Sequence, residues 1–176
     1  MKKMVILGIS CLLVVVNLQG QTSKAEKKEK KKEQAAQEYA ATKQLIESDS
    51  YSFVAAQTTP LGGQRRWLNT TPNYVNIENG EADIYLPYYG VVQAGIGYGA
   101  DAGIKFKGTL ENYVVEANDS KQTIRITFEV QRHNESHEFN FTVHRGASAN
   151  LVVASNRRNT ISYLGEVSEL DMPLTN

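Results

Sequence analysis

From Tyr51 to Ser168 the sequence alternates between apolar and polar residues with a period of two, and this pattern restricts the fold more than any other feature. In the segment "QTIRITFEVQ" four apolar residues share one face: Ile124, Ile126, Phe128 and Val130. A period of two is typical of a β-strand with one buried face. Eight or nine such segments follow one another with no helix between them, which excludes a parallel sheet. We therefore predict a mainly β protein with an antiparallel domain over residues 51–168.

The order of the segments favours a meander, because each strand can pair with the next through a short turn. A meander of this length predicts an up-and-down barrel, and a two-sheet sandwich is the alternative. Asn79-Gly80 is the strongest turn signal. A two-residue loop there predicts three cross-strand pairs: Val75 with Ile84, Ile77 with Ala82, and Tyr74 with Tyr85. The same register sets Glu78 opposite Glu81, an unfavourable pair, so we expect a turn slightly longer than the minimal one.

Three further hairpins are predicted. The first joins "GIKFKG" to "NYVVEA" and offers four core residues: Ile104, Phe106, Tyr113 and Val115. In the second, a four-residue turn over residues 133–136 gives two pairs: Phe128 with Phe141, and Ile126 with Val143. The third is joined by residues 156–159 and gives two more: Val153 with Ile161, and Leu151 with Tyr163.

Residues 21–50 have a different character from the β domain. They are rich in Ala, Lys, Glu and Gln, which are strong helix formers, so we predict a charged N-terminal helix or stalk. An apolar stripe begins only in its second half: Ala35, Tyr39, Thr42 and Ile46. Because that spacing puts the stripe on one helix face, we expect residues 35–48 to dock on the β domain. Residues 169–176 are expected to form a flexible tail.

The first 20 residues read as a signal peptide. Lys2 and Lys3 precede an apolar run over residues 5–16, which is too short to span a bilayer comfortably. We expect cleavage near Gly20. The mature protein should then be periplasmic or secreted, with no transmembrane span. A retained short membrane anchor is the alternative. Cys11, the one cysteine, lies inside the run after Gly8-Ile9-Ser10, so we do not expect a lipid anchor there. The mature chain would then have no thiol for disulfides, zinc or nucleophilic catalysis.

Charge gives no indication of a nucleic-acid partner. The chain has 19 basic and 19 acidic residues, so its formal net charge is zero and no basic field is available. The glycine-rich stretch 90–103 also fails as a phosphate site, because the dinucleotide fingerprint needs a following helix and a strand follows here. The P-loop spacing fails because Ile96-Gly97 stand where Lys-Ser/Thr is needed. We predict no cofactor, and we interpret the stretch as a mobile lip between strands.

No motif nominates an enzyme. His133 and His137 flank a predicted turn beside Glu138, but no third ligand is identified, so we predict a solvent-facing pair and no metal site. His144 is expected to point outward from its strand. A G-x-S-x-G elbow is absent from the sequence. Two carboxylates could still converge at the barrel mouth, which leaves a hydrolase open.

Arginines and aromatic residues gather in the segments expected at a barrel end. The candidate binding residues are Arg65, Arg66, Trp67, Tyr88, Tyr89 and Tyr98. Such side chains can stack on a ligand or anchor a partner. They can equally close the barrel end, with their polar atoms reaching water. Both interpretations stay open at the level of the sequence.

Several motifs together resemble one bacterial family. A helix ending "LIES", then "YSF", "YLPYYG", "AGIKF" and "ISYLGEV", resemble in their order the Bacteroidetes family known as domain of unknown function 4251. The resemblance runs from Gln37 to Val167 and implies a lipocalin-like barrel in a small secreted or lipid-anchored envelope protein. It implies no catalytic residues. We predict a monomeric, non-catalytic binding or interaction protein, with a small apolar ligand or an envelope protein as partner. The alternatives are a hydrolase at the barrel mouth and a structural protein with a filled barrel.

Overall fold

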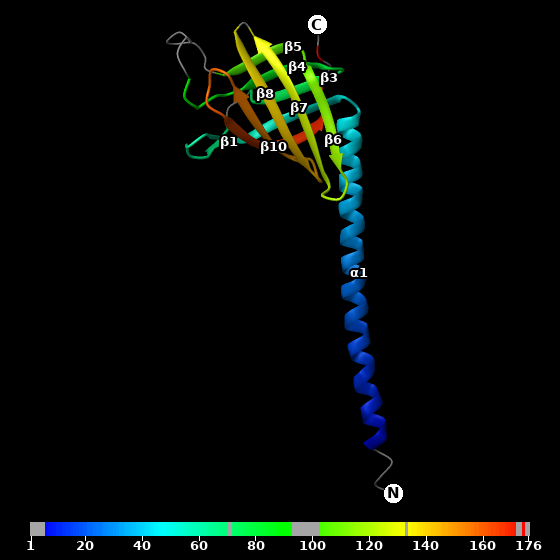
Figure 1. Ribbon diagram of the computed structural model, residues 1–176. Coiled ribbons are helices and arrows are strands. Elements are labelled where there is room, and N and C mark those ends of the chain that lie inside the picture. The colour runs from blue at the N-terminus through cyan, green and yellow to red at the C-terminus, as the bar shows by residue number, and fades with distance from the viewer. Residues whose placement is uncertain (1–5, 70–71, 93–102, 133, 172–173, 175–176) are drawn as a thin grey trace. The chain divides into compact units, whose positions relative to one another are not determined.

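The computed structural model describes residues 6–69, 72–92, 103–132, 134–171 and 174, with side chains from Lys24 onward. The chain divides into two compact units, residues 1–37 and 38–176. Helix α1 (Ile6–Glu47) supplies the described part of the first unit and the start of the second (Figure 1). Its charged stretch over residues 24–34 is exposed, which agrees with the absence of an apolar face in that sequence. No helix in the described part of the chain is both long and apolar enough to cross a membrane.

The second unit is a nearly closed antiparallel barrel (Figure 1). Its strands are β1 (Ser50–Pro60), β2 (Arg66–Trp67), β3 (Tyr74–Glu78), β4 (Glu81–Leu86), β5 (Ile104–Thr109), β6 (Glu111–Asn118), β7 (Thr123–Arg132), β8 (Glu135–His144), β9 (Ser148–Ser155) and β10 (Ile161–Glu169). The order in the sheet is β5-β4-β3-β1-β10-β9-β8-β7-β6, with β2 on β1. The first and last long strands therefore pair with each other. The prediction of a mainly β antiparallel barrel with one N-terminal helix is confirmed.

The predicted hairpin between "GIKFKG" and "NYVVEA" is wrong. β5 pairs with β4 and β6 pairs with β7, so these two strands are the edges of the sheet. Only Leu110 separates them; its side chain is buried, and its N–H donates to the carbonyl of Gly80 at 2.9 Å. The chain thus turns a corner instead of folding back on itself. As a result Tyr113 is half-buried and Val115 is exposed, so Val115 does not belong to the core.

The Asn79-Gly80 hairpin has the predicted register. Both turn residues adopt positive φ, 52° at Asn79 and 76° at Gly80, as a two-residue type I′ turn requires. Glu78 does pair with Glu81, so the expected lengthening of the turn is wrong. Both carboxylates keep partial contact with solvent, which weakens their repulsion.

The register of β7 and β8 differs from the prediction by two residues. Phe128 pairs with Phe139, and Ile126 pairs with Phe141. Arg132 already pairs with Glu135, so the loop holds two residues where four were expected. Both registers put the same side chains inside, because a shift of two preserves the alternation. The register predicted for β9 and β10 is confirmed, with Val153 opposite Ile161 and Leu151 opposite Tyr163.

The inward face of the barrel is packed with large side chains. The largest side chains that are less than 2% exposed are Ile46 of α1 and, from the strands, Tyr51, Tyr163, Phe53, Phe128, Phe139, Phe141, Ile77, Ile84, Leu86, Ile124 and Ile126. The Phe128 and Phe139 rings stack at 4.8 Å between centroids, and Phe53 meets Phe141 edge-on at 5.2 Å. These contacts fill the interior as they do in an ordinary protein core.

The C-terminal part of α1 belongs to this core. Tyr39, Thr42 and Ile46 are buried, as the apolar stripe predicts. The Tyr39 hydroxyl donates to Asp119 at 2.8 Å, and the Lys43 ammonium lies 3.2 Å from the same carboxylate. The docked part of the helix is thereby tied to the segment that follows β6.

Candidate functional site

Three loops meet at one end of the barrel: residues 61–67 after β1, residues 87–92 after β4, and residues 156–160 between β9 and β10. Backbone hydrogen bonds join them. The N–H of Leu61 donates to the carbonyl of Thr160 at 3.0 Å, and the N–H of Asn159 donates to that of Val91 at 3.1 Å. We call this region the loop end. The sequence-predicted site residues of the described chain all lie here.

Tyr88 holds the loop end together from within. Its side chain is only 6% exposed, and its hydroxyl lies 2.8 Å from the carbonyl of Asn159 and 3.0 Å from that of Val91. Burial is the main reason that its pKa is raised, and the nearby Arg158 opposes this shift. Tyr163 acts in a similar way, since its hydroxyl donates to the carbonyl of Pro87 at 2.9 Å. Tyr88 therefore fills the barrel end, as one of the two interpretations predicted.

Trp67 does the opposite. It is 69% exposed, so the interpretation that it closes the barrel is wrong. The reason is the pairing of β2 with β1: Trp67 pairs with Gln57, which lies on the outer face of β1, while the next residue, Leu68, takes the buried position. Arg65 is also exposed. Tyr98 lies outside the described residues.

Arg66, which precedes Trp67 in the chain, forms an exposed pair with Tyr89. The guanidinium carbon of Arg66 lies 5.4 Å from the centroid of the Tyr89 ring, a distance at which cation–π attraction operates. Tyr89 is 45% exposed. The structure thus brings Arg66 and Tyr89 together and leaves both accessible, on the same pair of loops as the exposed Trp67.

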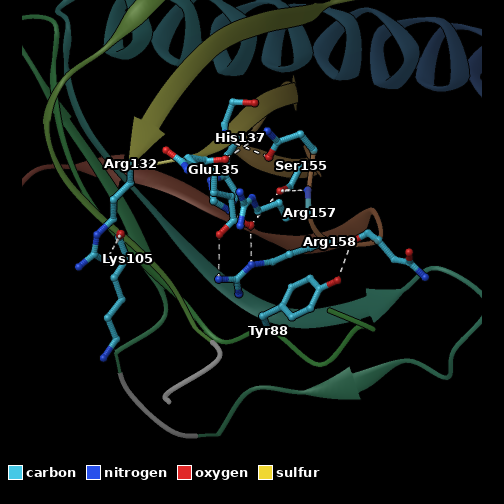
Figure 2. Close-up of polar contacts among 12 residues, drawn as sticks. Tyr88, Lys105, Arg132, Glu135, His137, Ser155, Arg157 and Arg158 are labelled. Atoms are coloured by element: carbon cyan, nitrogen blue, oxygen red, sulfur yellow. Dashed lines mark hydrogen bonds and ion pairs between the residues drawn. The ribbon is translucent and has the colours of Figure 1, made fainter. Parts of the chain in front are cut away.

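An ion cluster that the sequence analysis missed lies inside the loop end (Figure 2). Arg158 donates twice to Glu135, from Nε at 2.7 Å and from Nη2 at 3.2 Å. Ser155 donates its hydroxyl to the same carboxylate at 2.8 Å, and Nε2 of His137 lies 3.3 Å from it. The Arg158 guanidinium also lies 5.2 Å from the centroid of the Tyr88 ring. The cluster therefore links β8, β9 and two of the three loops.

The alternation of β8 contained a signal for this cluster. Phe139 and Phe141 face inward, so His137 and Glu135 must share that face, and a charged residue at an inward position needs a buried partner. His137 is 6% exposed, so the expectation that it faces solvent is wrong. Glu138 points to the opposite face, and His133 lies outside the described residues. His144 is exposed, as predicted.

The charges in the cluster follow from their surroundings. Burial alone would raise the pKa of Glu135, but the hydrogen bonds from Arg158 and Ser155 outweigh it and the pKa is lowered. Burial lowers the pKa of His137; the Arg158 charge adds to this and the Glu135 charge opposes it. The carboxylate is thus ionised, the guanidinium is charged, and the imidazole is neutral at neutral pH.

Sequence comparison places this barrel in a family. A family profile described as "Domain of unknown function (DUF4251)" matches residues 16–167. The chain belongs to the DUF4251 family. Its fold resembles the crystal structure, at 1.95 Å resolution, of a DUF4251 family protein from Bacteroides eggerthii DSM 20697. The TM-score is 0.58 and the identity 18%, with 76% of this chain and 89% of that chain covered. This likeness concerns the fold alone. No curated protein matches the chain.

In this DUF4251 chain, the hydrogen bonds and charges of the ion cluster suit a structural role better than a catalytic one. The Ser155 hydroxyl donates to Glu135 and not to His137, and this carboxylate is a weak base because its pKa is lowered and Arg158 already pairs with it. Glu135, with its lowered pKa, cannot act as a general acid near neutral pH. Within the described residues no group of three His, Cys, Asp or Glu side chains could hold a metal ion. What the cluster can do is hold the loop 156–160 against β8 and against the loop that carries Tyr88 and Tyr89.

Proposed function

We propose that this DUF4251 protein is a non-catalytic interaction protein of the bacterial cell envelope, which binds another envelope protein through Trp67, Arg66 and Tyr89. The observation that carries the proposal is the 69% exposure of Trp67. Trp, Arg and Tyr are the residues most enriched among those that dominate binding energy in protein interfaces. Two more apolar side chains of the same loops, Leu61 and Val91, are 69% and 65% exposed. We propose that these side chains supply the apolar part of the interface and that Arg66 supplies a cation at its rim.

A protein partner fits this surface better than an enclosed small apolar ligand. A small-molecule pocket commonly has about 300–1,000 Å³ and largely apolar walls. The interior that could supply such walls is filled by aromatic and aliphatic side chains. Trp67 instead lies exposed on the short strand β2, where the surface of a partner protein can cover it.

The proposed compartment rests on the N-terminal sequence. Lysines at positions 2 and 3 and the apolar run that follows them support export, with the mature chain beginning at Gln21 as a soluble monomer. The motifs shared with the family and the Bacteroides relative support an origin in Bacteroidetes. Mass spectrometry of the protein from fractionated cells tests this: an intact Met1, or a fatty acid on Cys11, contradicts the proposal.

Site-specific photo-cross-linking tests the interface. A photoreactive phenylalanine derivative replaces Trp67 in one chain and Val115, exposed on β6, in a control chain. We expect an adduct of one discrete mass with an envelope protein from position 67 and none from position 115. Purified partner should then bind Arg66→Ala and Tyr89→Ala at least about tenfold more weakly, a typical effect for an important interface residue. Equal cross-linking from both positions contradicts the proposal, and so does unchanged affinity of both variants. The absence of any adduct favours the structural alternative of a filled barrel.

A further inference from the structure

A groove outside the proposed interface lies between the edge strand β5, its neighbour β4 and the end of β7. We call it the seam groove. It has a volume of about 700 Å³, and its walls include Asp83, Tyr85, Lys105, Phe106, Lys107 and Arg132. These residues come from β4, β5 and the end of β7. Neither Trp67 nor Tyr89 is in its wall, so the groove is separate from the proposed protein interface.

We infer that the seam groove binds a small organic anion, a molecule with an apolar or ring-shaped body and one or two carboxylate, sulfate or phosphate groups. Among the described residues of its walls, Lys105, Lys107 and Arg132 are cations and Asp83 is a carboxylate. A concave surface with an excess of one charge concentrates ligands of the opposite charge. The inference does not rest on the proposed function, because different residues carry it.

The register of β4 and β5 determines how the charges lie. Tyr85 pairs with Lys105 and Asp83 pairs with Lys107, and paired side chains share one face of a sheet. The Lys105 ammonium lies 4.5 Å from the centroid of the Tyr85 ring, a cation–π contact that holds the charge beside an aromatic surface. Asp83 faces Lys107 across the strands, so this carboxylate has a cation directly opposite.

Arg132 closes the groove from the other side. Its Nη1 donates to the carbonyl oxygen of Lys105 at 3.1 Å, which fixes the guanidinium against β5 (Figure 2). A guanidinium has five N–H donors, and their planar arrangement matches the two oxygens of a carboxylate, sulfate or phosphate. The cross-strand neighbour of Arg132 is Glu135, whose charge Arg158 already compensates. Glu135 therefore has a charge partner other than Arg132, and Arg132 lies in the wall of the groove.

Size and wall chemistry restrict the ligand further. The volume lies within the range of sites for drug-sized molecules and is far larger than one inorganic anion needs. Tyr85 and the half-buried Phe106 supply ring surfaces on which an apolar body can rest. The groove should thus favour a ring with an acidic group over the acidic group alone.

Titration of the full chain with 2-naphthalenesulfonate tests the inference, with 2-naphthalenemethanol and inorganic phosphate as comparison probes. In ¹H–¹⁵N spectra we expect the sulfonate to shift the amides of Lys105 and Lys107. Arg132→Gln and Lys107→Gln should each weaken its binding by about tenfold or more, as expected for the loss of a charge-assisted hydrogen bond. Arg125→Gln is the matched control, because Arg125 is a surface cation on the same strand as Arg132, with 68% of its side chain exposed. It should change the affinity less than twofold.

Four outcomes overturn the inference. The first is equal affinity for the sulfonate and the neutral alcohol, since the cations would then contribute nothing. The second is phosphate binding as tight as sulfonate binding, which indicates an inorganic ion site only. The third is shifts confined to residues outside the groove. The fourth is wild-type affinity in Lys107→Gln, whose exposed side chain can be changed without opening the contact between Arg132 and β5.

Discussion

Removal of one partner from the Glu135–Arg158 pair should strongly destabilise the barrel. Only 14% of the Glu135 side chain and 8% of the Arg158 side chain are exposed, and two hydrogen bonds of 2.7 and 3.2 Å join them. In Arg158→Met the carboxylate keeps Ser155 as a donor but loses its charge partner. In Glu135→Gln the guanidinium stays buried beside the Tyr88 ring without a carboxylate.

The expected magnitude follows from this burial. Leaving one charge of a buried pair uncompensated costs about 3–5 kcal/mol of unfolding free energy. The lower end applies to Arg158→Met, because Ser155 still donates to the carboxylate and some solvent reaches it. We therefore expect a loss of about 3 kcal/mol, which is roughly a 10 °C decrease in Tm for a domain of this size. The double variant Glu135→Gln/Arg158→Met should lose less than the sum of the two single losses, by about 1–3 kcal/mol.

Urea denaturation of the wild type, both single variants and the double variant measures this coupling as a complete cycle. The midpoints should move while the slopes stay equal, which shows that stability and not compactness has changed. Single losses below about 0.5 kcal/mol that simply add would refute the reasoning, because they are the behaviour of a solvated surface pair. An apparent change in slope would instead show that the loop end opens before the rest of the barrel.

Three further predictions concern acid stability, a close backbone approach and the exposed tryptophan. The pKa of His137 in the folded chain lies below the usual 6.5, so the unfolded chain takes up this proton at a higher pH than the folded chain. The free energy of unfolding should therefore decrease as the pH falls from 6.5 through the folded pKa. The urea midpoint of His137→Gln should decrease less steeply over that pH window. Gly165→Ala should cost about 3 kcal/mol in urea denaturation, because its Cβ would lie 2.0 Å from the carbonyl oxygen of Val54, and a loss near zero would mean that the two strands separate easily there. Trp67→Ala should change the unfolding free energy by less than about 0.5 kcal/mol, whereas Phe141→Ala, at 1% exposure, should cost about 3–5 kcal/mol; equal losses in thermal denaturation would show that Trp67 is part of the core.

The loop end shows what local sequence patterns can and cannot predict. Tyr88 and Trp67 are both aromatic residues in loops, and no local rule separates them. Their roles depend on residues from other elements. The Tyr88 hydroxyl donates to the carbonyl of Asn159, and Trp67 faces outward because it pairs with Gln57 of β1. The interpretation that these side chains close the barrel end is correct for Tyr88 and wrong for Trp67, and binding at Trp67 stays a prediction.

Pairing shows the same limit. The period of two correctly predicted which side chains of β7 and β8 face inward, because that depends only on neighbours along the chain. It could not predict that β5 and β6 would be the edges of the sheet, since either strand has a suitable pattern for pairing with the other. Leu110, buried between them, takes the place that a turn would need.

The sequence by itself determined the antiparallel β domain, the Asn79-Gly80 turn and the docked stripe of the helix, because each depends on alternation, on helical spacing or on the φ angles that one dipeptide allows. Only the tertiary structure decided the seam groove and the Glu135–Arg158 pair. Both need residues that are far apart along the chain, 23 positions for the ion pair and 27 for the contact of Arg132 with Lys105. Their positions follow from strand order and register, which are selected by the packing of the whole core and not by any single segment.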